Sequence, residues 1–206
     1  MVSTVAPWAE PVPGVDRLVT ADELLTWPED PQFAWRYELV AGRLVRMPPT
    51  GVEHWDIGVP LFRALDTFTA AHNLGRVTWP DTGFRLNQPG QEDIVLSPDI
   101  AFVSAERLAR LPARNTPERR RFFPMAPDLA VEIASPDQHW PEMATKAQLY
   151  VAMGVRLVWI AWPGRREVDV WRPGTARPAA TLRPGDQLDG GDVVPGFTYP
   201  VADLFR

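Results

Sequence analysis

The stretch that decides the fold runs from Asp128 to Ala134 and reads DLAVEIA, a short apolar strand pattern that contains one glutamate, Glu132. A second stretch, SPDIAFV from Ser97 to Val103, places Asp99 at the start of a strand that otherwise reads as core. A carboxylate beside a hydrophobic core is costly unless it is paired, hydrogen-bonded or bound to a metal ion. Two such groups on adjacent strands repel each other unless a cation lies between them. Asp99 and Glu132 are therefore candidate metal ligands, and the alternative is that each faces solvent or forms a salt bridge.

Magnesium suits this pair, because it is usually bound by one or two carboxylates, with water and substrate phosphate completing its octahedron. The backbone carbonyl of Ile133 is a further candidate ligand. Glu38 is a third acid within a strand-like stretch, residues 35–40, and a candidate for binding the metal or orienting it through its water shell. A salt bridge or a solvent-facing position fits its sequence context equally well.

Lys146 is the only lysine of the chain, against 20 arginines, a bias that GC-rich coding explains. It lies 14 residues after Glu132, in a predicted helix that can fold back over the end of the strand. A lysine there is a compact donor that can orient or deprotonate an attacking water molecule. The alternative is a surface ion pair with Glu142, because the two residues have i,i+4 spacing in the favourable order. Tyr150, one turn further on, is a candidate for contacting substrate or supporting Lys146, and the alternative is a core residue.

The remaining pattern is that of a mixed α/β domain, a sheet flanked by helices with further β-strands toward the C-terminus. Thr20 and Glu23 have capping-box spacing and predict a short helix. His54, ahead of a longer helix, is a candidate for contacting phosphate or capping that helix. The other expected elements are strands 35–40 and 43–47 as a hairpin, a helix over 53–72, strands 75–86 and 94–103, a short helix after Ser104, a helix from Pro141 to Met153, and strands 155–161 and 167–171.

Composition narrows the class of protein. Of the 206 residues, 1–17 are Pro-rich without periodicity and predict a loose arm, and 18–206 predict one domain. Without cysteine the chain has no disulfides or thiolate metal sites, and it lacks both a membrane-length apolar run and a secretory signal pattern. These features favour the cytoplasm and no membrane partner. The net charge of −5 argues against a tight, non-specific DNA binder, and the one local basic cluster is the Arg-rich loop 112–121.

Taken together, these motifs resemble the bacterial Uma-type (Uma two) family of predicted endonucleases, a branch of the PD-(D/E)XK restriction-endonuclease superfamily. The resemblance runs from about Thr20 to Phe205. The matching stretches are YELVAG at 37–42, DTGF at 81–84, SPDIAFV at 97–103, APDLAVEI at 126–133, SP at 135–136, the segment from Lys146 through Tyr150 to Val155, VWI at 158–160 and VADLF at 201–205.

The resemblance implies a restriction-endonuclease-like fold, a catalytic set of Glu38, Asp99, Glu132 and Lys146, and magnesium or manganese as cofactor. The superfamily's usual lysine position, two residues after the second acid, holds Ala134 in this chain. The resembled family instead carries the lysine on the next helix, which Lys146 matches. Members often have an aspartate six residues after the glutamate, where this chain has Gln138.

The function expected from these features is metal-dependent hydrolysis of phosphodiester bonds, with DNA as the expected partner and a homodimer as a hypothesis. The principal alternative is a nuclease-fold accessory protein that binds nucleic acid or a protein partner without turnover. A β-rich small-molecule binder is a third reading, resting on the Pro/Gly-rich C-terminal third. The sequence contains neither a Gly-rich phosphate loop nor a Gly-x-Ser-x-Gly elbow.

Overall fold

Two β-sheets organise the part of the chain that the computed structural model describes, which comprises residues 6–28, 36–78, 80, 82–86, 92–112 and 122–206. The larger sheet has six strands in the order β11-β10-β9-β8-β7-β4. Its strands are β4 Gly75–Thr78, β7 Ile100–Ser104, β8 Leu129–Ile133, β9 Leu157–Trp162, β10 Glu167–Trp171 and β11 Ala180–Leu182. This six-stranded sheet flanked by helices is the mixed α/β architecture predicted from the sequence.

One parallel pair fixes the centre of the larger sheet. Strands β8 and β9 run parallel, whereas the other neighbouring strands of this sheet are antiparallel. A parallel pair needs a crossover connection, which is usually a helix. Helix α4, Trp140–Ala152, supplies it, with Pro141 in its first turn and Gly154 at a positive φ after its end. Lys146, on this helix, therefore lies next to the C-terminal end of β8.

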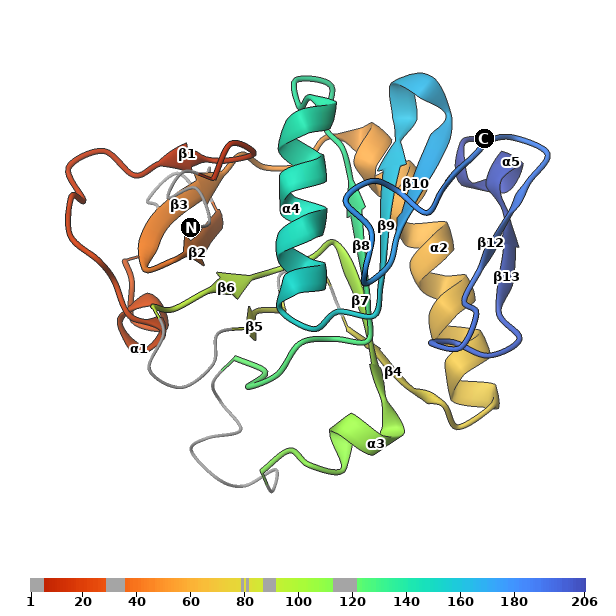
Figure 1. The fold of residues 1–206 in the computed structure, drawn as a ribbon, viewed down its shortest axis with the longest axis horizontal. Helices are drawn as coiled ribbons and strands as arrows, with labels where there is room; N and C mark the ends of the chain where they lie inside the picture. Colours follow the sequence, from red (N-terminus) through yellow and green to blue (C-terminus); the bar gives the residue numbers. More distant parts are fainter. Residues whose placement is uncertain (1–5, 29–35, 79, 81, 87–91, 113–121) are drawn as a thin grey trace.

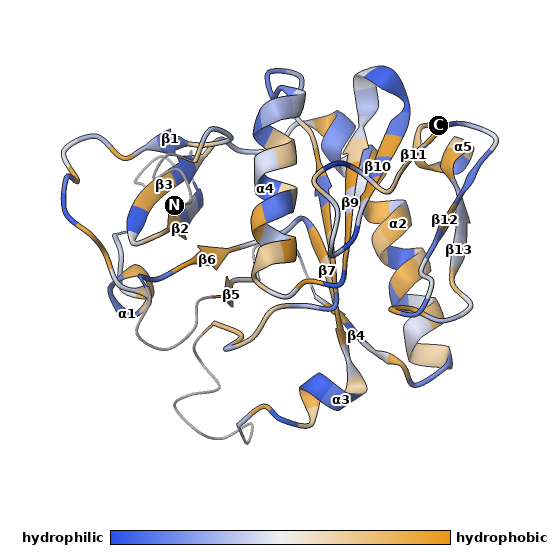
Figure 2. Cartoon of the chain, viewed as in Figure 1, coloured by the Kyte–Doolittle hydropathy of each residue, from blue (hydrophilic) through white to orange (hydrophobic). Residues whose placement is uncertain are grey.

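The two faces of the larger sheet are covered by different helices. Helix α4 lies on one face, and helix α2, Val52–Ala71, lies on the other (Figure 1). Helix α2 begins where the sequence predicted and continues through Pro60. The central strands are coloured hydrophobic, whereas the turn between β9 and β10 is hydrophilic (Figure 2). Each face of the sheet is thus buried in its own apolar cluster.

The smaller sheet has five strands in the order β1-β3-β2-β6-β5. Its strands are β1 Glu10–Pro11, β2 Arg36–Val40, β3 Arg43–Met47, β5 Phe84–Arg85 and β6 Val95–Leu96. The predicted hairpin is confirmed as β2 and β3, and its two turn residues, Ala41 and Gly42, have φ of 50° and 71°. Two positive φ values match the right-handed strand twist in a two-residue hairpin.

Two predicted strands were wrong in extent, because each divides between the sheets. The stretch 75–86 gives β4 in the larger sheet and β5 in the smaller one, and 94–103 gives β6 and β7. Pro98 cannot donate to a β-ladder. The amide of Ser97 donates to the Glu38 carboxylate instead. Chain connectivity at this break brings the two sheets together at Asp99.

Residues 6–12 of the predicted loose arm pack against the smaller sheet, which corrects the prediction for this part of it. Strand β1 pairs with β3, and Ala6 and Trp8 are buried. Glu10 also forms a salt bridge with Arg46, 2.8 Å between Oε2 and Nη2. The buried indole of Trp8 anchors this segment, although no periodic pattern in the sequence indicates that it is buried.

The shorter elements complete the architecture. Helix α1, Ala21–Leu24, carries the predicted capping box of Thr20 and Glu23, and α3, Ala105–Leu108, begins after the N-cap Ser104. The C-terminal third adds β11, a ribbon of β12 Gln187–Asp189 with β13 Thr198–Pro200, and helix α5 Val201–Leu204. The Arg-rich loop lies almost wholly outside the described residues. No helix in the described ranges combines the length and apolarity that a bilayer crossing requires.

Candidate functional site

Strand β8 presents Glu132 to helix α4. Successive side chains of a strand point to opposite faces. Ala130 packs in the cluster on the α4 side, and Val131 packs in the cluster on the α2 side. Glu132 shares the face of Ala130 and is 4% exposed. A carboxylate is thereby aimed from an apolar strand at the helix that carries Lys146.

Lys146 is buried between two carboxylates. Its Nζ lies 3.0 Å from Oε1 of Glu132 and 3.7 Å from Oε2 of Glu38, and the residue is 1% exposed. The alternative of a surface ion pair with Glu142 was wrong. The Glu142 carboxylate accepts a hydrogen bond from the backbone N–H of His139, 3.1 Å, as part of the capping box at the start of α4.

Asp99 immediately precedes the neighbouring strand β7 and lies beside Glu132. The antiparallel register pairs Ile100 with Val131, which places Asp99 beside Glu132, as the adjacent-strand prediction required. Oδ2 of Asp99 accepts a hydrogen bond from the backbone N–H of Ile133, 2.8 Å. The two acids therefore share one end of the central strand pair.

His54 contacts Asp99 and does not cap its helix. The helix N-cap is Gly51, so His54 lies inside the first turn of α2. Its Nε2 is 2.9 Å from Oδ1 of Asp99, and its buried Nδ1 has no hydrogen-bond partner in the described structure. Burial alone would raise the pKa of Asp99, but His54 and the Ile133 amide together lower it.

Glu38 reaches the site from the smaller sheet. It lies on β2, and its Oε1 accepts a hydrogen bond from the backbone N–H of Ser97, 2.7 Å. Its buried Oε2 has no hydrogen-bond donor in the described structure, although Lys146 Nζ lies at 3.7 Å. Both sheets thus contribute an acid to one cluster.

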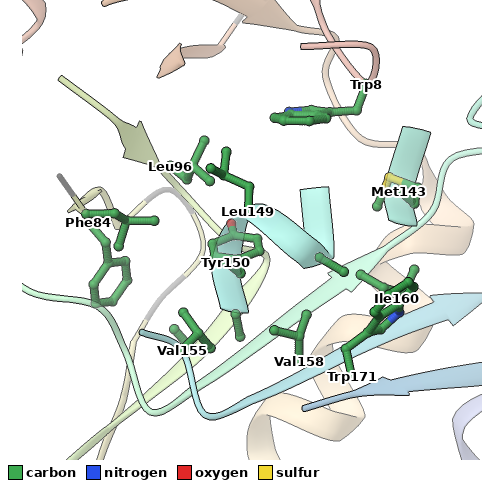
Figure 3. Close-up of a cluster of buried hydrophobic side chains, with 14 of the residues drawn as sticks. Trp8, Phe84, Leu96, Met143, Leu149, Tyr150, Val155, Val158, Ile160 and Trp171 are labelled. Atoms are coloured by element: carbon green, nitrogen blue, oxygen red, sulfur yellow. The ribbon is translucent and has the colours of Figure 1, made fainter. Parts of the chain in front are cut away.

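Tyr150 holds Glu132 from within the core. Its hydroxyl donates a 2.6 Å hydrogen bond to Oε1 of Glu132. Its ring lies in the buried cluster with Leu149, Val155 and Val158 (Figure 3). Burial and the charge of Glu132 raise the pKa of Tyr150 well above its usual value. Tyr150 is both a core residue and a partner of the site.

The cluster shares an unusual charge balance. Burial raises the pKa of Glu132 to about 7, with Asp99 and Glu38 adding to the rise and Lys146 and Tyr150 opposing it. Burial alone would lower the pKa of Lys146, but the three carboxylates together raise it, so the ammonium stays charged. Three buried acids share one lysine, which leaves an excess of negative charge near Glu132.

The residues present fit a magnesium ion that takes few protein ligands. Asp99 and Glu132 are neighbours with a surplus of negative charge, and Oε2 of Glu38 is buried without a hydrogen-bond donor. No three His, Asp or Glu side chains of the described ranges are grouped closely enough to hold one ion. The neighbouring carboxylates of Asp99 and Glu132 suit magnesium, which usually takes one or two carboxylates and keeps several waters.

A cavity of about 910 Å³ opens onto this cluster. It is lined by Glu38, His54, Asp99, Glu132, Ile133 and Lys146, together with Trp8, Trp27, Tyr37 and Phe122. The sequence interpretation missed this aromatic wall. Trp8 lies in the Pro-rich segment that reads as an arm, so no local pattern indicated that it joins a cavity.

Comparisons with known proteins agree with this fold. The sequence profile of the Uma2 family, described as "Putative restriction endonuclease", matches residues 21–202. No functionally curated protein matches the chain. Among solved structures, the chain is similar to "a putative nuclease belonging to DUF820" from Anabaena variabilis ATCC 29413. The TM-score is 0.72 at 21% identity, over 91% of this chain and 97% of that chain, a likeness that shows a common fold.

Proposed function

The chain belongs to the Uma2 family, described as "Putative restriction endonuclease", and from this premise we propose that it is a magnesium-dependent endonuclease acting on DNA. The observation that carries the proposal is the position of Lys146. The only lysine of the chain is buried 3.0 Å from Glu132, with Glu38 and Asp99 in the same cluster. Burying charged groups costs free energy even when they are paired, so a structural role alone gives little reason to build such a cluster.

Asp99 and Glu132 would hold the metal ion, which when bound supplies charge to polarise the phosphate and lowers the pKa of a water molecule. Manganese fits the same oxygen ligands. The Ile133 carbonyl remains a proposed additional ligand.

The other side chains have roles that follow from their contacts. Lys146 keeps its ammonium charged, donates hydrogen bonds to orient the attacking water, and steadies negative charge at the phosphate in the transition state. Glu38 positions the lysine, and its Oε2 is available to accept a hydrogen bond from a water molecule bound to the metal ion. Tyr150 fixes the Glu132 carboxylate by holding one of its oxygens. His54 does the same for Asp99.

The decisive test replaces Lys146 while preserving its volume. In Lys146→Met the methylene stem stays buried and the ammonium is lost, so we expect DNA cleavage in magnesium or manganese to fall at least about 100-fold. Lys146→Arg keeps the charge, but its broad planar fork does not fit a site built for a compact donor. It should lose activity as well. The measurement is initial cleavage rate on single-stranded, double-stranded and branched DNA.

The control is Arg110→Ala, which removes an exposed cation that pairs with Glu106. It should cleave like the wild type. Undiminished cleavage by folded Lys146→Met would sink the assignment. A wild-type protein that binds magnesium through Asp99 but cleaves none of the substrates would instead support the non-catalytic accessory role.

A further inference from the structure

Aromatic side chains line the cavity together with the acidic cluster. Trp27, Tyr37 and Phe122 line the cavity, and all three are partly buried. Each also packs against the apolar cluster that contains Leu39 and Val95. Each side chain is therefore supported from behind by core residues while it borders the cavity. Supported aromatic rings of this kind are the platforms on which unpaired bases stack.

The charge around the cavity disfavours a polyanionic duplex. Among the described lining residues, six are carboxylates, and Arg36 and Lys146 are the lysine or arginine side chains. Lys146 is already held by the buried acids, and Glu10 is paired with Arg46. Affinity for nucleic acid normally comes from many cationic contacts to phosphates. Binding in this cavity must draw on other contacts, which the aromatic rings supply.

The depth of the acidic cluster also limits the form of the substrate. The side chains of Lys146, Glu132 and Asp99 are 1%, 6% and 8% exposed. A stacked duplex is stiff, with a persistence length of about 50 nm. Its phosphates are fixed on the outside of a wide rod, so a phosphate reaches the buried cluster more readily where the strand is unstacked. A single strand bends freely and brings a phosphate to the cluster with its base against the wall.

We propose that the site takes single-stranded DNA, with an unpaired base stacked on the aromatic wall at Trp27 while the adjoining phosphate meets Asp99, Glu132 and Lys146. This inference rests on the proposed nuclease function and adds the class of its substrate. The base contact is independent of sequence, because every base has an aromatic face.

The test measures equilibrium binding in EDTA, where no cleavage occurs. The probes are a fluorescently labelled single-stranded oligonucleotide and the hairpin duplex of the same sequence, titrated with full-length protein. We expect the single strand to bind at least about tenfold more tightly, and Trp27→Ala to weaken that binding about tenfold. The logarithm of affinity should fall with the logarithm of salt concentration with a slope of about −1, because few phosphates are contacted.

Two further variants make the result interpretable. Trp55→Ala removes an indole that is 63% exposed on α2, outside the described cavity lining, and should bind like the wild type. Trp27→Phe keeps a ring and should retain most of the affinity, which separates stacking from misfolding in Trp27→Ala. Equal or tighter binding of the duplex overturns the inference, as does unchanged single-strand binding in Trp27→Ala. If the protein cleaves DNA and prefers duplex, the inference fails while the proposed function stands. If the protein prefers the single strand but does not cleave DNA in magnesium, the inference stands while the proposed function fails.

Discussion

The hydroxyl of Tyr150 and the ammonium of Lys146 meet the same oxygen of Glu132, at 2.6 Å and 3.0 Å. Both donors lie on Oε1, and together they fix the orientation of the carboxylate that we propose as a metal ligand. Tyr150 is not among the described residues that line the cavity. It acts on Glu132, and its influence on chemistry passes through that carboxylate.

Removal of the Tyr150 hydroxyl should therefore weaken metal use more than it slows the chemical step. We expect Tyr150→Phe to raise the magnesium concentration for half-maximal cleavage about tenfold, since partners that orient a ligand typically contribute that much. The maximal rate at saturating magnesium should change little. Cleavage titrations against magnesium measure both quantities. Tyr199→Phe, on β13, is the control, and a maximal rate as low as that of Lys146→Met would contradict the positioning role.

At the scale of elements, the start of α4 is fastened to the larger sheet by one buried aspartate. Asp169 on β10 is 4% exposed, and it accepts hydrogen bonds from the indole N–H groups of Trp140 and Trp162, 2.9 and 3.0 Å. The Thr181 hydroxyl donates to its other oxygen, 2.6 Å. Three neutral donors thus satisfy a buried carboxylate and join α4, β9, β10 and β11. This contact holds Trp140, the first residue of α4, against the sheet.

Loss of this carboxylate should destabilise the fold measurably. Asp169→Ala leaves buried donors without an acceptor, each costing about 1–3 kcal/mol, so we expect the free energy of unfolding to fall by about 3 kcal/mol or more. Urea unfolding followed by tryptophan fluorescence measures it. The matched control lies on the same strand: Glu167→Ala removes a salt bridge to Arg183, 2.9 Å, that is largely exposed on the Arg183 side. Its effect should stay within about 1 kcal/mol. An equal loss of unfolding free energy in the two variants would contradict a role for Asp169 in holding α4 to the sheet.

At the scale of the whole molecule, the site joins the two sheets. Glu38 comes from the smaller sheet, Glu132 from β8 of the larger sheet, Asp99 from the residue before β7, and Lys146 from the crossover helix. The break at Pro98 carries the chain from one sheet to the other beside Asp99. Repulsion among the three acids works against this assembly, and a bound cation relieves it. If the cluster holds magnesium as proposed, metal binding and the stability of the native state are coupled.

Magnesium should raise the stability of the protein through Asp99. A ligand that binds only the folded state at about 100 times its dissociation constant adds about 2.7 kcal/mol to the free energy of unfolding. We expect the wild type to gain this amount and to lose it again with EDTA, whereas Asp99→Asn gains little. Thermal or urea unfolding across a magnesium titration gives the values. Asp192→Asn, which alters an exposed carboxylate paired with Arg156, should retain the full gain. A similar gain in Asp99→Asn would place the ion elsewhere.

By itself, the sequence determined the parts of the protein that depend on local pattern. The apolar runs around Glu132 and Asp99 predicted neighbouring strands, and the spacing from Glu132 to Lys146 predicted a helix folding back over the strand end. Both are confirmed in the structure. Strand alternation and helical spacing act over a few residues, so they are readable without the rest of the fold. The catalytic roles of these residues remain predictions.

Only the tertiary structure decided how Lys146 and His54 are paired. Spacing alone left Glu142 and Glu132 as rival partners of the lysine, because surface and buried positions of a helix share the same local pattern. Lys146 is buried between Glu38 of β2 and Glu132 of β8, which resolves the choice, since a buried ammonium needs carboxylates beside it. The burial of Trp8 and the division of two strands between sheets also arise from long-range packing. That packing brings Glu132 of the opening stretch together with Asp99 and the lone lysine in one cluster.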